Sequence, residues 1–216
     1  MRIALLGATG RTGRNVTEQA RAAGHHVVAY VRRPEALAPG AGLTVVGGQL
    51  DDREALTAAF AGCDAVVLTL GPSRITNASK PLMQVAVPAA IEAARATGVS
   101  RIVVLSALGV GETFANTRYP YRFGCRTFLA GNFREHTAGE SALVGSGLDW
   151  TTVHPGPLSD GERTPFPTVV DAATGYRMPG APRTTRADVA ATILGALEDP
   201  TTFGKQLLVT SARQAS

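Results

Sequence analysis

The stretch that decides the fold is Arg2-Ile3-Ala4-Leu5-Leu6, followed by Gly7-Ala8-Thr9-Gly10-Arg11-Thr12-Gly13. The first five residues have the apolar character of a buried strand, and three glycines at three-residue spacing come directly after them. A helix pattern starts at once, with Val16, Ala20 and Ala23 at positions i, i+4 and i+7. A strand, a glycine-rich turn and a helix bind a pyrophosphate in parallel-sheet proteins, because glycines let the ligand approach the backbone and free N–H groups meet its charge. The stretch therefore predicts a dinucleotide site.

The spacing of these glycines differs from the standard G-x-G-x-x-G fingerprint, so its context carries the prediction. The turn follows an expected strand and opens an expected helix, and a second strand over residues 26–31 comes after Gly24. The alternative is a glycine-rich turn that serves only packing. The strand–turn–helix–strand order favours the dinucleotide.

Two arginines stand at the end of the second expected strand. An NAD site usually has Asp or Glu there for the ribose 2′-hydroxyl, whereas an NADP site has Arg nearby for the 2′-phosphate. This chain has Arg32 and Arg33, and no acid before Glu35. A guanidinium pairs with phosphate oxygens two at a time, so the pattern predicts NADPH, with Arg32 the stronger candidate. Arg11 and Arg14 either add positive charge at the turn or are ordinary surface arginines.

The rest of the chain alternates short apolar strands with helices, which predicts an α/β fold: a doubly wound parallel sheet (Rossmann fold) in a single domain over residues 1–216. Further strands are expected at residues 43–46, 64–68, 101–105, 148–153 and 205–210. Ligands of such sheets bind beyond the carboxyl ends of the strands, where the glycine turn, Gly71 and Ser106 fall.

Two less regular segments are expected on the substrate side. Residues 109–135 mix polar and aromatic side chains, and residues 155–185 contain six prolines. Long irregular excursions within a domain are usually functional, so we expect these segments to form the substrate pocket and a small irregular lid.

Composition narrows the class of protein. The net charge is +4 and the pI about 9.5, but the basic residues are scattered and no Lys/Arg run supports nucleic-acid binding. The sequence has no 18-residue apolar run and no signal peptide, and Cys63 and Cys125 make neither a disulfide framework nor a metal motif. We expect a cytoplasmic, metal-free protein that acts on a small molecule, away from membranes, as a monomer or homodimer.

Five stretches carry a resemblance to a known family. They are residues 7–13, 31–33, 98–106, 146–156 and 186–190. Together they make the chain resemble the atypical short-chain dehydrogenase/reductase group, which includes the NmrA-like regulators and the biliverdin reductase B/flavin reductase type. The resemblance extends over nearly the whole chain.

The resemblance implies a set of cofactor contacts. Thr9, Gly10, Thr12 and Gly13 would contact the pyrophosphate, and Arg32 the 2′-phosphate. Leu50 would contact the adenine, and Leu70 and Gly71 would flank the nicotinamide ribose. Gln49 stands where family members usually have Asp, and its amide can still hydrogen-bond adenine. The full set of candidate cofactor-binding residues is Gly7, Thr9, Gly10, Arg11, Thr12, Gly13, Arg32, Arg33, Gln49, Leu50, Leu70, Gly71, Ser106, His154 and Pro155.

The catalytic positions depart from the group's pattern. Its active dehydrogenases pair a Ser with Tyr-x-x-x-Lys, and this sequence has no Tyr-x-x-x-Lys; Asn132 and His136 stand at those two positions. His136 could bind the ribose or donate a proton, or be a helix-surface histidine. His154 stands where relatives often have Arg before Pro-Gly. Ser106 is the best candidate for polarising a substrate oxygen, although a strand-end hydroxyl can also serve the backbone.

Three functions remain open, with Ser106, His136 and His154 as candidate catalytic residues. The first is an NADPH-dependent reductase that passes a hydride to a planar conjugated acceptor such as a flavin, quinone, tetrapyrrole or enone, which can take its proton from solvent. The second is a non-catalytic NADP(H)-binding regulator of the NmrA-like kind, favoured by the missing Tyr-x-x-x-Lys. The third, a sugar-nucleotide epimerase, requires more C-terminal chain than is present here.

Overall fold

One eight-stranded sheet forms the centre of the molecule in the computed structural model, which describes residues 1–71, 82–127 and 129–211. The strand order is β3-β2-β1-β4-β5-β6-β10-β8, and all neighbours pair in parallel except β10 and β8, which are antiparallel. The strands are β1 (Arg2–Leu6), β2 (His26–Val31), β3 (Leu43–Gly47), β4 (Ala65–Leu68), β5 (Arg101–Leu105), β6 (Asp149–Pro155), β8 (Thr168–Asp171) and β10 (Lys205–Thr210). The order reverses beside β1, so the glycine turn lies where such sheets bind ligands.

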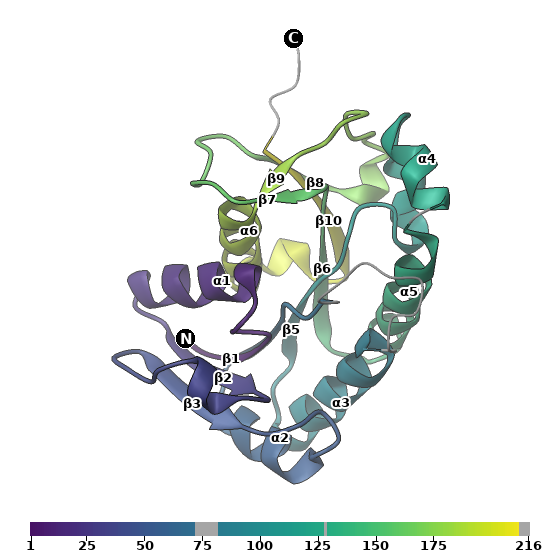
Figure 1. Cartoon of the computed structure of the whole chain (residues 1–216). Coiled ribbons are helices and arrows are strands. Elements are labelled where there is room, and N and C mark those ends of the chain that lie inside the picture. Colours follow the sequence, from purple (N-terminus) through teal and green to yellow (C-terminus); the bar gives the residue numbers. More distant parts are fainter. Residues whose placement is uncertain (72–81, 128, 212–216) are drawn as a thin grey trace.

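Helices cover both faces of this sheet (Figure 1). On one face lie α1 (Arg11–Ala22) and α6 (Arg186–Glu198), and on the other lie α2 (Arg53–Phe60), α3 (Leu82–Thr97) and α5 (Ala130–Val144). The shorter elements are η1 (Pro34–Ala36), η2 (Gly111–Asn116), α4 (Tyr121–Arg126), β7 (Leu158–Ser159), η3 (Ala172–Thr174), β9 (Thr184–Thr185) and η4 (Pro200–Thr202). Among the described residues, every helix is too short or too polar to cross a bilayer.

The core follows from the alternation of side chains along the strands. In β1, Ile3 and Leu5 face the cluster under α1 and α6, whereas Ala4 and Leu6 face the cluster under α2 and α3. All four are almost fully buried. Because each fully buried Leu or Ile contributes about 1.5–3 kcal/mol, β1 holds the glycine turn on a rigid base. The doubly wound α/β fold is confirmed.

Residues 155–185 are more regular than the expected irregular lid. They contain β8, which extends the sheet at its edge, and β7, which pairs in parallel with β9 in a small second sheet. The sequence analysis assigned this segment to the lid and expected no strand in it, so the antiparallel edge strand β8 is an addition to the predicted parallel sheet. Its sequence, Thr168-Val169-Val170-Asp171, is short, and a half-exposed edge strand lacks the continuous apolar run that marks a central strand.

Candidate cofactor and catalytic site

The glycine turn between β1 and α1 needs glycine at two of its three positions. Gly7 has a φ of +95°, and a Cβ there would lie 2.8 Å from Thr69 Oγ1. A Cβ on Gly13 would lie 2.1 Å from the carbonyl oxygen of Gly7, so the first turn of α1 packs directly on the glycine turn. Gly10 donates its N–H to the same Gly7 oxygen at 2.9 Å. The turn is therefore fixed by contacts that no larger residue would permit.

The start of α1 presents unpaired amides at the carboxyl ends of the strands. Gly10 is the N-cap, and no side chain of the described residues caps this 12-residue helix. The first helical bond runs from Arg14 N to Gly10 O, which leaves the amides of Arg11, Thr12 and Gly13 for an external acceptor. These donors and the positive end of the helix dipole fit a pyrophosphate.

Arg32 and Arg33 follow β2 directly, and both are exposed. Neither guanidinium has an ion-pair or hydrogen-bond partner within residues 1–71, 82–127 and 129–211. Both are therefore free to pair with an anion on the β2 side of the glycine turn. The phenol of Tyr30 donates to the carbonyl oxygen of Gln49 at 2.8 Å, which holds the β3 end next to β2.

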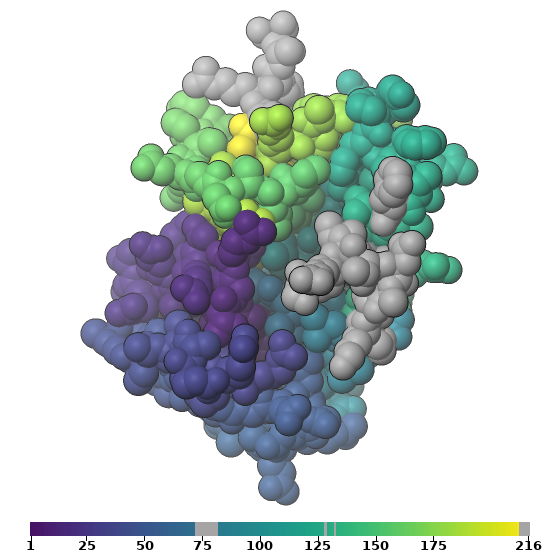
Figure 2. Space-filling view, in the orientation of Figure 1, coloured from purple at the N-terminus to yellow at the C-terminus, as the bar shows by residue number. Residues whose placement is uncertain are grey.

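Arg11 is engaged elsewhere on the surface. Its guanidinium pairs with Asp160 at 3.2 Å, and the same carboxylate pairs with Arg186 at 2.7 Å. Figure 2 shows the segment that contains Asp160, coloured light green, directly beside the purple N-terminal segment. Arg11 would have to leave Asp160, or share it, in order to contact a phosphate.

The remaining cofactor candidates surround the same edge of the sheet. Thr9 and Gly71 are exposed, whereas Thr12 and Pro155 are buried. Leu50 and Leu70 are half-buried against the core cluster under α2 and α3. The chain directly after Gly71 lies outside the described residues.

Ser106 lies at the carboxyl end of β5, and its hydroxyl donates to Oε1 of Glu140 on α5. Both residues are buried, with 6% and 7% of their surfaces exposed. Burial raises the pKa of Glu140 to about 7, against the lowering effect of the Ser106 hydrogen bond, and the charge of Glu112 raises it further. The candidate hydroxyl is therefore hydrogen-bonded to a carboxyl group that exchanges its proton near neutral pH.

His154 lies beneath this pair, fully buried on β6. Its Nδ1 is 3.0 Å from the carbonyl oxygen of Ala107, which can only accept a hydrogen bond, so Nδ1 carries the hydrogen. Its Nε2 then accepts from the hydroxyl of Thr152 at 2.8 Å and lies 3.7 Å from Glu140 Oε1. Burial lowers the pKa of His154 to about 4, so it is neutral at pH 7 and leaves Glu140 without a cation.

His136 joins the group from α5, one turn before Glu140. It is 8% exposed, which excludes the helix-surface alternative. Its Nδ1 is buried without a hydrogen-bond partner among the described residues, and burial lowers its pKa to about 4. The side chain of Asn132 lies outside the described part of the structure.

The sequence analysis missed Glu140. A signal was present, because Glu140 follows His136 by four residues and precedes Leu143 by three, which places an acid on the buried face of the helix. An acid on that face is rarely fully buried without a specific partner, and here the partner is Ser106.

Tyr119 and Tyr121, in the segment of residues 109–135, offer no free phenol to this group. Tyr119 is 80% exposed. Tyr121 packs near Leu108 and donates its phenol to the Leu108 carbonyl oxygen at 3.0 Å, and burial raises its pKa. Its hydroxyl is already used by the backbone.

Comparisons with known proteins agree with this geometry. The family model described as NAD(P)H-binding matches residues 7–200. The chain is 29% identical to "Uncharacterized sugar epimerase YhfK" of Bacillus subtilis, over 94% of this chain and 90% of that protein. It is 35% identical to the (4-alkanoyl-5-oxo-2,5-dihydrofuran-3-yl)methyl phosphate reductase of Streptomyces griseus, over 86% of this chain and 56% of the reductase.

A solved structure shares the whole architecture. The anaerobilin reductase ChuY of Escherichia coli O157:H7 is 25% identical and superposes with a TM-score of 0.81, and the match covers 100% of both chains. The family match includes the glycine turn, β5 with Ser106, and the Thr185–Asp188 cap of α6, where the Thr185 hydroxyl accepts from Asp188 N at 3.1 Å. The chain therefore belongs to the NAD(P)H-binding family, among the atypical short-chain dehydrogenases/reductases that its sequence resembles.

Proposed function

We propose that the protein is an NADPH-dependent reductase that reduces a planar, conjugated small molecule such as a flavin, quinone, tetrapyrrole or enone. When bound, NADPH supplies the hydride. The observation that carries the proposal is the Ser106–Glu140 hydrogen bond at the carboxyl end of β5. It puts a hydroxyl with access to a titrating proton at the edge of the sheet where the glycine turn also lies.

The relatives support a reductase as the reaction class. Two of them, from Streptomyces griseus and Escherichia coli, bear the names of reductases. A third bears the name of an epimerase, so the reductase reaction has to be tested directly. We expect the reductase to act in the cytoplasm.

The preference for NADPH rests on Arg32. Its exposed guanidinium follows β2, where the adenosine ribose of a bound dinucleotide lies in this fold. An arginine without a competing carboxylate favours a 2′-phosphate over a 2′-hydroxyl. Arg33 would assist from the neighbouring position.

Each residue of the buried group has its own role in this proposal. When Glu140 is protonated, its carboxyl group donates to Ser106 Oγ, and the Ser106 hydroxyl then donates its own hydrogen to the reacting oxygen or nitrogen of the acceptor. His154 is uncharged, with its Nε2 3.7 Å from Glu140 Oε1, and adds no positive charge beside the carboxyl group. His136 offers its Nδ1, unpartnered among the described residues, at the position that is Lys in the group's active dehydrogenases. Residues 109–135 and 155–185 would close over the acceptor.

The test begins with titration of the purified protein with NADPH and NADH, followed by turnover with a panel of flavins, quinones, tetrapyrroles and enones. We expect turnover of at least one conjugated acceptor and about a hundredfold lower kcat for Ser106→Ala with unchanged NADPH affinity. Ser100→Ala is the matched control, because Ser100 is an exposed serine just before β5, at the opposite end of that strand from Ser106.

The competing function is a non-catalytic NADP(H)-binding regulator. The observation that favours it is the pair Asn132 and His136 in place of Tyr and Lys, with a His136 that is uncharged at pH 7. Tight NADPH binding without turnover of any acceptor in the panel, and without effect of Ser106→Ala, would establish the regulator and overturn the reductase.

A further inference from the structure

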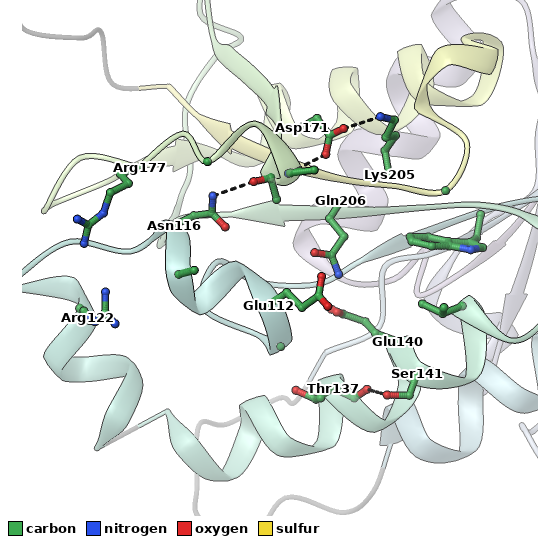
Figure 3. A pocket seen from close by; sticks show the side chains of 18 residues that line it. Glu112, Asn116, Arg122, Thr137, Glu140, Ser141, Asp171, Arg177, Lys205 and Gln206 are labelled. Carbon is green, nitrogen blue, oxygen red and sulfur yellow. Dashed lines mark hydrogen bonds and ion pairs between the residues drawn. The ribbon is translucent and has the colours of Figure 1, made fainter.

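A groove of about 890 Å³ lies between α5, η2 and the β6–β10 region of the sheet. Figure 3 shows its interior, where the side chains of Glu112, Glu140 and Gln206 point toward one another. The groove is bounded by the start of β10, which is the opposite strand end from the one that carries the glycine turn. It is therefore a second opening into the buried group.

Glu140 is the residue that the groove and Ser106 share. Its Oε1 accepts the Ser106 hydrogen bond, while a Cβ on Gly111, in the wall of the groove, would lie 3.6 Å from its Oε2. The two carboxyl oxygens thus face different surroundings. One touches the hydroxyl at the cofactor edge, and the other faces the groove.

We propose that Glu140 relays protons from water in the groove to the Ser106 hydroxyl. The acceptor, once it has gained a hydride, takes the Ser106 proton on its oxygen or nitrogen. Ser106 Oγ is reprotonated by Glu140, and Glu140 takes a proton from groove water. The sum is one hydride and one proton added to the acceptor, which balances a two-electron reduction. This inference rests on the proposed function.

Burial makes such a relay useful. Only 6% of Ser106 is exposed, and Glu140 is the side-chain partner of its hydroxyl in the described part of the chain. A proton lost from Ser106 is therefore replaced through Glu140 more directly than from bulk water. Proton transfer requires hydrogen-bond contact, and this contact is already formed.

The charged groups around Glu140 keep its proton exchangeable. His154 on β6 and His136 on α5 are neutral at pH 7, and Glu112 on η2 disfavours a second negative charge. On β10, Lys205 is paired with Asp171 at 2.7 Å. Two arginines in the groove are also engaged.

Those arginines have partners in the neighbouring η2 segment. Arg122 on α4 lies over the Phe114 ring with its guanidinium carbon 4.5 Å from the centroid, and Arg177 donates to the Thr117 carbonyl oxygen at 3.2 Å. Glu140 consequently forms no ion pair with Lys205, Arg122 or Arg177. Its carboxyl group can then hold and release a proton near neutral pH.

The first test needs no cofactor and no turnover. Infrared difference spectra of the purified protein, recorded from about pH 5 to about pH 9, detect the C=O stretch of a protonated carboxylic acid. We expect a buried carboxyl to titrate near neutral pH and to disappear in Glu140→Gln. Glu112→Gln should shift that titration to lower pH, because it removes a neighbouring negative charge. A Glu140 that stays ionised throughout would overturn the relay while leaving the reductase proposal intact.

The second test uses turnover with the acceptor found above. Glu140→Ala should lower kcat about a hundredfold with NADPH affinity unchanged, and formate, which fits the space opened toward the groove, should restore part of the rate. Formate should not rescue Ser106→Ala, and Ser100→Ala should behave as wild type. Wild-type kcat and pH profile in Glu140→Gln, or no formate rescue of Glu140→Ala, would overturn the relay. If no acceptor turns over at all, the proposed function fails, and the infrared titration still reports on Glu140.

Discussion

The glycine turn after β1 and the buried group around Glu140 differ in how their polar groups are exposed and partnered. The turn leaves three backbone amides at the start of α1 and two exposed arginines after β2 without partners among the described residues. The buried group removes a carboxyl and two imidazoles from water and provides no cation to balance them. The first region offers hydrogen-bond donors to an anion, and the second holds an exchangeable proton on Glu140. In the proposed function, the first binds the cofactor and the second supplies the proton of the reaction.

The largest expected effect is on the glycine turn. Gly13→Ala should reduce NADPH affinity more than a hundredfold and cost on the order of 3 kcal/mol of stability, because its Cβ would meet the Gly7 carbonyl oxygen at 2.1 Å. Urea unfolding and NADPH titration measure both effects. Gly145→Ala is the control, since nothing lies within 4 Å of its Cβ. Normal binding by Gly13→Ala would mean that the turn is not the anion site.

The next effect concerns the stability cost of the buried acid. The folded pKa of Glu140, about 7, is above its ordinary value of 4.5, so the folded state binds more protons between these values. Stability is therefore lost as pH rises through that window, by on the order of 3 kcal/mol. Glu140→Gln cannot lose that proton, so its free energy of unfolding should exceed that of wild type increasingly from about pH 4.5 to about pH 7.

Urea unfolding at several pH values measures this difference. His136 and His154 destabilise both proteins alike below about pH 6.5, so their contributions cancel in the comparison. A difference that does not change with pH would show that Glu140 is ionised in the folded protein.

A smaller effect separates the two cofactors. Arg32→Ala should weaken NADPH binding about thirtyfold, which corresponds to about 2 kcal/mol for a charged hydrogen-bonded contact, and change NADH binding little. Arg134→Ala is the matched control, because Arg134 is an exposed arginine on α5, away from β2. Titration calorimetry with both dinucleotides decides the matter, and equal weakening of NADPH and NADH would rule out the 2′-phosphate contact.

The smallest effect is on Arg11. Its pair with Asp160 is exposed, with 71% and 70% of the two side chains accessible, so Arg11→Ala should change stability by less than about 1 kcal/mol. NADPH affinity in this variant shows whether the guanidinium serves the lid segment or the phosphate. An unchanged affinity would remove Arg11 from the cofactor site.

The two regions also differ in how far the sequence predicts them. Arg2–Leu6 was predicted as a strand with its observed bounds, and His26–Val31 likewise, because buried strands and glycine turns follow from local residue order. The cap of α6, Thr185-x-x-Asp188, is likewise a pattern of local residue order.

The buried group depends on contacts between distant segments. Ser106 and Glu140 are 34 residues apart, and His154 comes from a third element. Local pattern placed Ser106 at a strand end, but nothing local shows that Glu140 meets it or that His154 is fully buried. The antiparallel β8 was missed for a related reason, because its pairing with β10 is set by register across the sheet edge.

The carboxylate of Asp160 pairs with two guanidinium groups that are far apart in the sequence. Arg11 lies at 3.2 Å and Arg186 at 2.7 Å. An anion that binds Arg11 competes with Asp160 for the same donors. By thermodynamic reciprocity, binding of such an anion weakens the attachment of the segment that follows β7. The loss in free energy equals the loss in binding free energy that this attachment causes for the anion. Higher ionic strength screens exposed charges, so it weakens both the Arg11–Asp160 pair and any pair between Arg11 and an anion. If the ligand of the glycine turn contacts Arg11, the two ion pairs of Asp160 couple its binding to the position of the segment that follows β7.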